Sequence, residues 1–232
     1  MSMKTNFCLL LGLALTCWSF AQTGPSAFEA PDYVKIKNEI TDSGAVSYYP
    51  RLMERLKQYD TTLTVADYRL LYYGFLFQPG SSDLRIPEQE RELMPYYQSA
   101  QILPEQYDEI IELISQILET DPFYIRGLNF LGYVLHLKGE EDLAVRTSIR
   151  FGRTVNAILS TGDGLSPQTA FHVISPAHEY VVLNFLQLRY KNQNTLWIDG
   201  NVCDNFSLNK KQHIYFCVPY AIMKTQQNNT GL

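Results

Sequence analysis

The periodicity of the apolar residues changes once along this chain, close to residue 159. From Phe28 to Leu159 apolar residues recur three or four positions apart, as they do on one face of a helix. Beyond that point they form short β-branched or aromatic runs, separated by glycine, proline and asparagine. This order predicts an α+β fold, in which an N-terminal helical region carries a small antiparallel sheet packed on it.

The change in periodicity also divides the chain into segments. We predict a signal peptide at 1–21, a helical, repeat-like region at 22–159, a small antiparallel β region at 160–224 and a polar tail at 225–232. With 46% hydrophobic and 19% charged residues, the chain is apolar enough to fold. Its net charge of −5 argues against a broad positive face, so we expect no nucleic-acid partner.

The N-terminus has the three parts of a secretory leader. Lys4 supplies the positive charge, residues 7–20 form the apolar segment, and Ser19 and Ala21 are the small residues of a cleavage site. We therefore expect an exported protein, periplasmic or secreted. A lipoprotein anchor on Cys17 is disfavoured, because the residue before it is a poor fit to the lipoprotein motif. No later run is apolar enough to span a bilayer, so we expect no transmembrane helix after leader removal.

Two of the four cysteines, Cys8 and Cys17, lie in the predicted leader, and the mature chain keeps Cys203 and Cys217. If residues 209–211 form a three-residue hairpin loop, Cys203 and Cys217 face each other across two strands and a disulfide is possible. A two-residue loop places them on opposite faces. We favour two buried, unbonded thiols and keep the disulfide as the alternative.

Helix signals recur throughout the first region. Thr64 and Asp67 resemble a capping box, and Ser47 is placed to cap a helix with Pro50 in its first turn. The polar stretch 80–94 is expected as an exposed loop or lid. Together the signals predict helices at about 31–40, 47–59, 64–77, 104–120, 123–137 and 140–159.

The last two of these helices carry a repeat signature. In the tetratricopeptide pattern, small and large residues recur at fixed positions because two antiparallel helices approach closely. Counting from Ile125, the matching residues are Leu128, Leu131, Gly132, Leu135 and Ala144. We therefore interpret this segment as one tetratricopeptide-like helical hairpin.

The β region contains several strand-like runs and one strong turn. Asp199-Gly200 is the best hairpin turn of the chain. Residues 180–186 fit either a strand or a short helix, since a continuous apolar run sets no period. The strand-like runs are 171–174, 180–186, 196–198, 202–208 and 214–218.

The candidates for a catalytic site are His172, His178 and Glu179. On one extended strand the two histidines lie about 20 Å apart, so they meet only if Pro176 lies in a turn. His178-Glu179 begins like a metalloprotease motif, but Val182 stands where the second ligand belongs. We favour polar residues packed at a corner of the sheet over an acid–base or metal site, and expect no metal or cofactor.

Two further groupings are weaker. Cys203, Asp204 and His213 are chemically suited to a thiol nucleophile, although nothing in the sequence indicates an activated thiolate. Three tyrosine pairs offer faces on which a sugar could stack, but helical spacing favours a buried face. The pairs are Tyr48-Tyr49, Tyr72-Tyr73 and Tyr96-Tyr97. The last helix carries three arginines on one side, which could bind an anionic partner, but we favour a solvated face. They are Arg146, Arg150 and Arg153.

Several longer strings resemble domain-of-unknown-function family 4919. They comprise residues 48–56, 60–64, 67–69, 71–75, 160–164, 170–174, 178–180 and 214–216. The resemblance covers nearly the whole mature chain. It implies an exported, uncharacterised bacterial protein and transfers no activity and no catalytic residue.

These observations favour a non-enzymatic protein-binding or scaffold module of the cell envelope, because stacked helical hairpins form surfaces for partner proteins. The first alternative is a hydrolase-type or metal-dependent enzyme that uses His172, His178 and Glu179. The second is glycan or small-ligand binding through the tyrosine-rich helices.

Overall fold

The computed structural model describes residues 28–79, 81 and 87–219. The predicted leader and polar tail lie outside the described residues. The helices are α1 (Tyr33–Thr41), α2 (Tyr49–Lys57), α3 (Val65–Gly74), α4 (Glu88–Gln98), α5 (Tyr107–Thr120), α6 (Ile125–Lys138), α7 (Glu141–Leu159) and α8 (Pro176–Phe185). The strands are β1 (Phe171–His172), β2 (Asn192–Ile198), β3 (Asn201–Ser207) and β4 (His213–Val218). The α+β prediction is confirmed.

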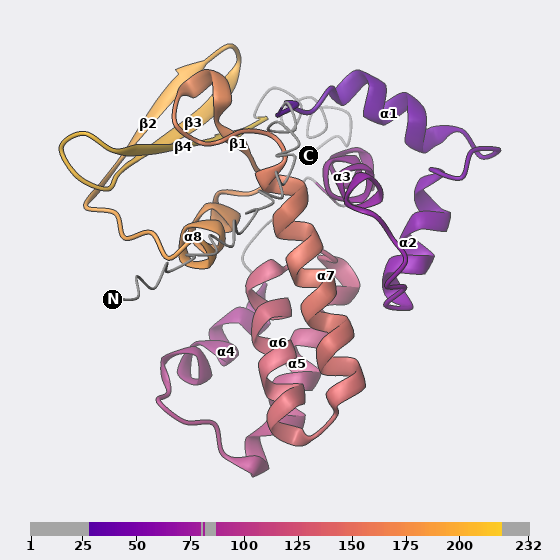
Figure 1. The fold of residues 1–232 in the computed structure, drawn as a ribbon. Helices are drawn as coiled ribbons and strands as arrows, with labels where there is room; N and C mark the ends of the chain where they lie inside the picture. Colours follow the sequence, from indigo (N-terminus) through magenta and orange to yellow (C-terminus); the bar gives the residue numbers. More distant parts are fainter. Residues whose placement is uncertain (1–27, 80, 82–86, 220–232) are drawn as a thin grey trace, which may run out of the picture.

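Helices α5, α6 and α7 lie side by side, and α3 crosses the upper end of this group with α1 and α2 beside it (Figure 1). The sheet lies on the side of the molecule away from α1 and α2, with α8 below it in this view (Figure 1). One hydrophobic cluster runs through both parts, from Leu56 and Tyr72 in the helices to Phe206 and Phe216 in the strands. The sheet and the helices therefore share a core.

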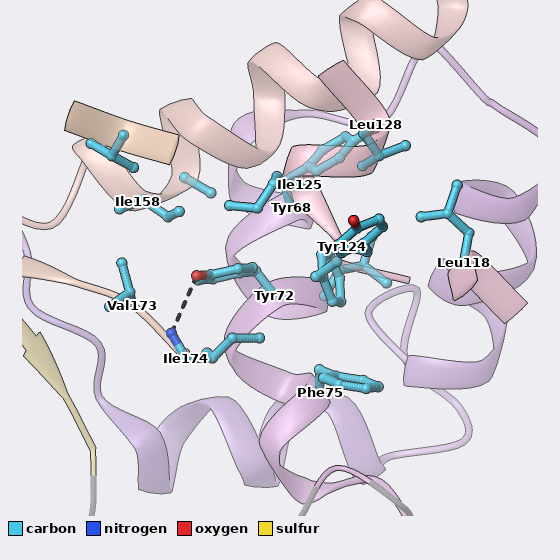
Figure 2. Packing of buried hydrophobic residues seen from close by; sticks show 14 of the residues in the cluster. Tyr68, Tyr72, Phe75, Leu118, Tyr124, Ile125, Leu128, Ile158, Val173 and Ile174 are labelled. Atoms are coloured by element: carbon cyan, nitrogen blue, oxygen red, sulfur yellow. Dashed lines mark hydrogen bonds between the residues drawn. The ribbon is translucent and has the colours of Figure 1, made fainter. Parts of the chain in front are cut away.

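Helix α3 lies at the centre of this core, and its start follows the sequence. Thr64 accepts a hydrogen bond from the backbone of Asp67, whose carboxylate accepts one from the backbone of Thr64, so the predicted capping box is confirmed. Its buried residues include Tyr68 and Tyr72 (Figure 2). Since this helix packs against both α1 and α7, its aromatic residues are core residues.

Helices α6 and α7 form an antiparallel pair. Gly139 ends α6 in the left-handed conformation, with φ of 86°, and α7 begins two residues later. A Cβ atom on Gly132 would lie 3.0 Å from the Ser148 hydroxyl and 3.7 Å from the Ala144 carbonyl oxygen. Glycine thus permits the close approach of the two helices. The likeness to a tetratricopeptide repeat itself stays a prediction.

Three expectations about the helical region are wrong. Residues 88–98, expected within or beside a polar loop, form α4. The polar sequence hid this helix because a surface helix needs little apolar area, and Leu93 is its one buried residue. Ser47 does not cap α2 but donates to the carbonyl oxygen of Glu39, and Tyr59 lies past the helix end with φ of 54°.

The sheet is mixed rather than antiparallel, in the order β1-β4-β3-β2. Strands β2, β3 and β4 form an antiparallel meander, in which the positive φ angles of Asp199 and Gly200 make the predicted hairpin turn. Strand β1 pairs with β4 in parallel, because it enters the sheet directly from the helical region and not through a hairpin. Residues 176–185 form α8, which resolves the ambiguity at 180–186 in favour of a helix; Ser175 caps it and Pro176 occupies its first position.

Candidate functional site

The structure places His172 on β1 and His178 and Glu179 in the first turn of α8, with three different sets of contacts. Because Pro176 starts a helix, the chain does turn between the two histidines, as a shared site requires. Their side chains nevertheless share no partner: the Tyr72 hydroxyl bonds to the ring of His178, whereas no described residue bonds to Nδ1 of His172. Across the described residues, no group of three or more histidine, cysteine or acidic side chains is arranged to hold a metal ion.

His178 is buried and fully hydrogen bonded. The Tyr72 hydroxyl lies 2.7 Å from its Nδ1 and also accepts a hydrogen bond from the backbone N–H of Ile174 at 3.2 Å (Figure 2 shows the Tyr72–Ile174 bond). A neutral imidazole has one N–H donor and one acceptor nitrogen; because a ring N–H bonds to the backbone of Phe123, Nδ1 is the nitrogen that accepts the hydroxyl proton of Tyr72. The other ring nitrogen keeps its proton. Burial lowers the pKa of His178 to about 3, so the ring is neutral at pH 7.

His172 is held by its backbone. Its N–H donates to the Thr161 hydroxyl at 2.9 Å, and its carbonyl oxygen accepts from the Tyr73 hydroxyl at 2.9 Å. Its ring Nδ1 is buried, and no described residue bonds to it. Burial, followed by the positive charge of Arg69, lowers the pKa of His172 to about 4. This ring is therefore also neutral at pH 7.

Glu179 is completely buried between α8 and the sheet. Its carboxyl group interacts with that of Asp204 on β3, a contact that we did not predict. Burial, followed by the negative charge of Asp204, raises the pKa of Glu179 to about 9. A carboxyl group that is shielded from solvent in this way has no access to a substrate from outside the protein.

Cys203 and Cys217 form a disulfide, where we favoured two unbonded thiols. The loop 209–211 has the three residues that bring the two cysteines into register, as the hydrogen bond from Leu208 N–H to the Gln212 carbonyl oxygen shows. Cys203 is therefore not a thiol nucleophile. Its neighbour Asp204 points to the opposite face of the strand.

The tyrosine-rich helices offer less stacking surface than the sequence suggested. Tyr49 on α2 and Tyr72 and Tyr73 on α3 are buried in the core, because α2 packs on α3 and α3 also packs on α1 and α7. Tyr97 is partly buried, and the guanidinium of Arg126 lies 3.8 Å from the centre of its ring. The Arg126 contact covers a face of Tyr97 on which a sugar could stack.

The arginines of α7 do not form the solvated face that we expected. Arg150 is buried and donates to the carbonyl oxygen of Pro122 at 2.7 Å. Arg153 donates to the carbonyl oxygen of Leu63. Only Arg146 pairs locally, with Asp142 one turn earlier. The long side chains of Arg150 and Arg153 instead reach across to neighbouring segments, which a helical wheel does not reveal.

The most exposed ordered part of the sheet is the hairpin of β2 and β3. Strand β2 forms one edge of the sheet, and within the described chain it pairs only with β3. Six of its seven residues are exposed, including Leu196 and Trp197. Tyr180 and Tyr190 are also exposed beside it, with ring centres 6.2 Å apart. This hairpin and the outer edge of β2 at residues 192–196 make up the candidate interaction surface.

Successive residues of β2 direct their backbone N–H and C=O groups alternately toward β3 and toward the outer edge of the sheet. Leu208 bonds to Gln212 across β3 and β4, so in β3 the even-numbered residues bond to β4 and the odd-numbered residues to β2. Asn194 and Leu196 lie opposite odd-numbered residues and bond to β3. The N–H and C=O groups of Gln193 and Thr195 therefore point away from the sheet.

The fold is that of an α+β protein with a helical body and a four-stranded mixed sheet. The chain belongs to the family described as Domain of unknown function (DUF4919), whose family model matches residues 34–229. No curated protein and no solved structure matches the chain. None of the described helices is long and apolar enough to cross a membrane.

Proposed function

We propose that this protein is a non-enzymatic protein-binding module, which receives an extended segment of a partner protein along the outer edge of β2, at residues 192–196. The observation that carries the proposal is that the backbone N–H and C=O groups of Gln193 and Thr195, in the regular and exposed edge strand β2, are directed away from the sheet. An added strand bonds to such groups, and main-chain hydrogen bonds then provide the affinity.

Edge strands of folded proteins usually carry features that prevent pairing. These features are lysine or proline residues, β-bulges or a very short strand. The sequence of β2 is Asn-Gln-Asn-Thr-Leu-Trp-Ile, without a charge or a proline, and its register with β3 is uninterrupted. The opposite edge of the sheet, β1, has only two residues. Of the two edges, β2 is thus the one suited to binding.

The charges at the ends of β2 indicate which segment fits. Lys191 precedes the strand and Asp199 follows it, and both are exposed. An antiparallel segment fits best with an acidic residue opposite Lys191, a basic residue opposite Asp199 and uncharged β-forming residues between them. Such charges fix the register of a strand more than they increase its affinity.

One observation supports a non-enzymatic role and another supports a place outside the cytoplasm. The candidate catalytic residues His178 and Glu179 are buried, and their side chains contact the protein itself. The Cys203–Cys217 disulfide agrees with an oxidising compartment, as does the leader-like N-terminus.

The experiment uses a synthetic peptide with the sequence of residues 191–199, which meets the stated requirements when it pairs antiparallel to β2. We expect the peptide to slow amide exchange at Gln193 and Thr195, measured by NMR, while Asn194 and Leu196 are protected with or without peptide. Thr195→Pro removes an outward N–H and should abolish the protection at Gln193, whereas the matched variant Thr195→Val should retain it.

If saturating peptide does not slow amide exchange at Gln193 and Thr195, the proposal is contradicted. Equal binding of the peptide by the Thr195→Pro and Thr195→Val variants would contradict it as well. Sedimentation of the protein without peptide shows whether a second copy occupies the edge. A dimer that Thr195→Pro dissociates would identify the partner as the chain itself.

A further inference from the structure

The first turn of α8 brings the carboxyl group of Glu179 into contact with that of Asp204 on β3. Glu179 is completely buried, Asp204 is nearly so, and the two interact across the contact between helix and sheet. No N–H or O–H donor of the described residues reaches either carboxylate oxygen of Glu179. An ionised carboxylate is very unfavourable in such a place, because it loses its hydration and gains no hydrogen bond.

The surroundings of Asp204 are different. Its two oxygens accept hydrogen bonds from the Thr195 hydroxyl at 2.5 Å and from the Gln193 amide at 3.0 Å. The carbonyl oxygen of the same Gln193 side chain accepts from the Tyr180 hydroxyl at 2.8 Å, which fixes the orientation of the amide. The Thr195 hydroxyl and the Gln193 amide therefore both donate to Asp204, whereas no such donor reaches Glu179, so the hydrogen bonds favour the anion on Asp204.

We propose that Glu179 carries a proton at neutral pH and donates it to Asp204, so that one shared proton fastens α8 to the β2–β3 hairpin. The proton satisfies an oxygen of Glu179 that otherwise has no partner, and it reduces the charge of the pair from −2 to −1. Two like charges in contact cannot both persist in a water-poor site. The inference concerns the fold and holds whichever partner the hairpin binds.

The other groups around the pair do not change this assignment. Among the described residues, the pKa of Glu179 is affected by burial and by Asp204, and both raise it, to about 9. On α8 itself, the helix N-terminus favours the anion, but only weakly. The Tyr180 hydroxyl is bonded to Gln193, and β2 contributes only neutral side chains. Arg189 and Lys191, in the preceding loop, are exposed to solvent.

The shared proton links folding to pH. A glutamate in the unfolded chain has a pKa of about 4.3, so at neutral pH the folded state holds a proton that the unfolded state releases. Raising the pH then favours unfolding. Between about pH 5 and pH 9, this single group raises the unfolding equilibrium constant about tenfold per pH unit, and above that range its effect stops.

Infrared spectroscopy tests the proton directly. We expect the wild-type protein at pH 7 to show the C=O stretching band of a protonated carboxyl group, and Glu179→Gln to lack it. The glutamine amide supplies its own N–H to Asp204, so this variant should also lose about one proton from the pH dependence of unfolding between pH 5 and pH 9. The matched variant Glu119→Gln, at an exposed glutamate of α5, should retain both the band and the slope.

A carboxyl ¹³C titration of Glu179 in the unmodified protein provides a second measurement that does not depend on the folding of a variant. A chemical shift that reports protonation at pH 7 supports the proposal. A shift that reports full ionisation at pH 7, or a wild type and a Glu179→Gln variant with the same band and the same pH slope, would overturn it.

Discussion

The hydroxyl of Tyr72 lies 2.7 Å from Nδ1 of His178, a bond that joins α3 to α8 across 106 positions of the sequence. The same hydroxyl accepts the backbone N–H of Ile174. Tyr72 thus connects the helical region to the segment that leads from the sheet into α8, and it explains why a histidine with a catalytic appearance is part of the core.

Tyr72→Phe should therefore destabilise the protein although the ring stays in place. The substitution leaves the His178 Nδ1 and the Ile174 N–H buried without their partner, which costs about 1–3 kcal/mol per unsatisfied group. Urea denaturation followed by circular dichroism measures the change. Tyr133→Phe, at a half-exposed tyrosine of α6, is the control and should change the free energy of unfolding by less than about 0.5 kcal/mol. Equal stability of Tyr72→Phe and wild type would show that the bond contributes nothing.

The disulfide should contribute substantially to stability. Cys203 and Cys217 are separated by 14 positions, and closing a loop of this size restricts the unfolded chain by about 3 kcal/mol. We expect reduction to lower the midpoint of urea unfolding. In the double variant Cys203→Ala/Cys217→Ala, the midpoint should be low and should not respond to the reductant. A wild type that also ignores the reductant, with both thiols shown to be free by alkylation, would contradict this prediction.

Two glycines in the helical pair should respond to substitution in opposite ways. A Cβ at Gly132 meets the Ser148 hydroxyl at 3.0 Å, so Gly132→Leu should force α6 and α7 apart and cost about 1–3 kcal/mol. Gly152 lies in α7 with nothing within 4 Å of its Cβ position. Gly152→Ala should therefore stabilise the helix, by up to about 1 kcal/mol. Thermal unfolding compares the two variants, and similar effects of both would refute the close approach at Gly132.

The elements that the sequence predicted well are those with a local signal. The capping box of Thr64 and Asp67 and the Asp199-Gly200 turn depend on residues within a few positions, and both occur in the structure. Helix α4 was missed because its helical signal is a single buried leucine among charged residues.

The contact between Glu179 and Asp204 had no such signal. It joins residues 25 positions apart, from a helix and a strand, and depends on how α8 packs on the sheet. The pairing of Thr195 with Asp204, in contrast, follows from the hairpin turn by counting residues. The position of Thr195 opposite Asp204 could thus be predicted from the hairpin. Only the tertiary structure shows that Glu179 lies beside Asp204.

His172 should make the protein less stable in acid. Its folded-state pKa of about 4 lies below the usual value of 6.5, so between these values the unfolded state binds a proton that the folded state does not. Stability should then fall as the pH decreases from about 6.5 to about 4, by about 1.4 kcal/mol per pH unit for this group. His172→Gln removes the titrating ring, whose Nδ1 bonds to no described residue, and should reduce this slope by one proton in urea titrations at several pH values. An unchanged slope would mean that the ring is protonated in the folded protein.

Amide exchange in the free protein should alternate along β2. Asn194 and Leu196 bond to β3, whereas the N–H groups of Gln193 and Thr195 point away from it. Exchange at Asn194 and Leu196 requires the hairpin to open, so it should be slower than at Gln193 and Thr195, by at least about tenfold for an opening free energy of 1.4 kcal/mol. NMR detection after transfer to deuterated solvent resolves the four sites. Uniform protection along the strand would show that the edge of β2 is already paired, and the binding surface proposed for this protein would then have to lie elsewhere.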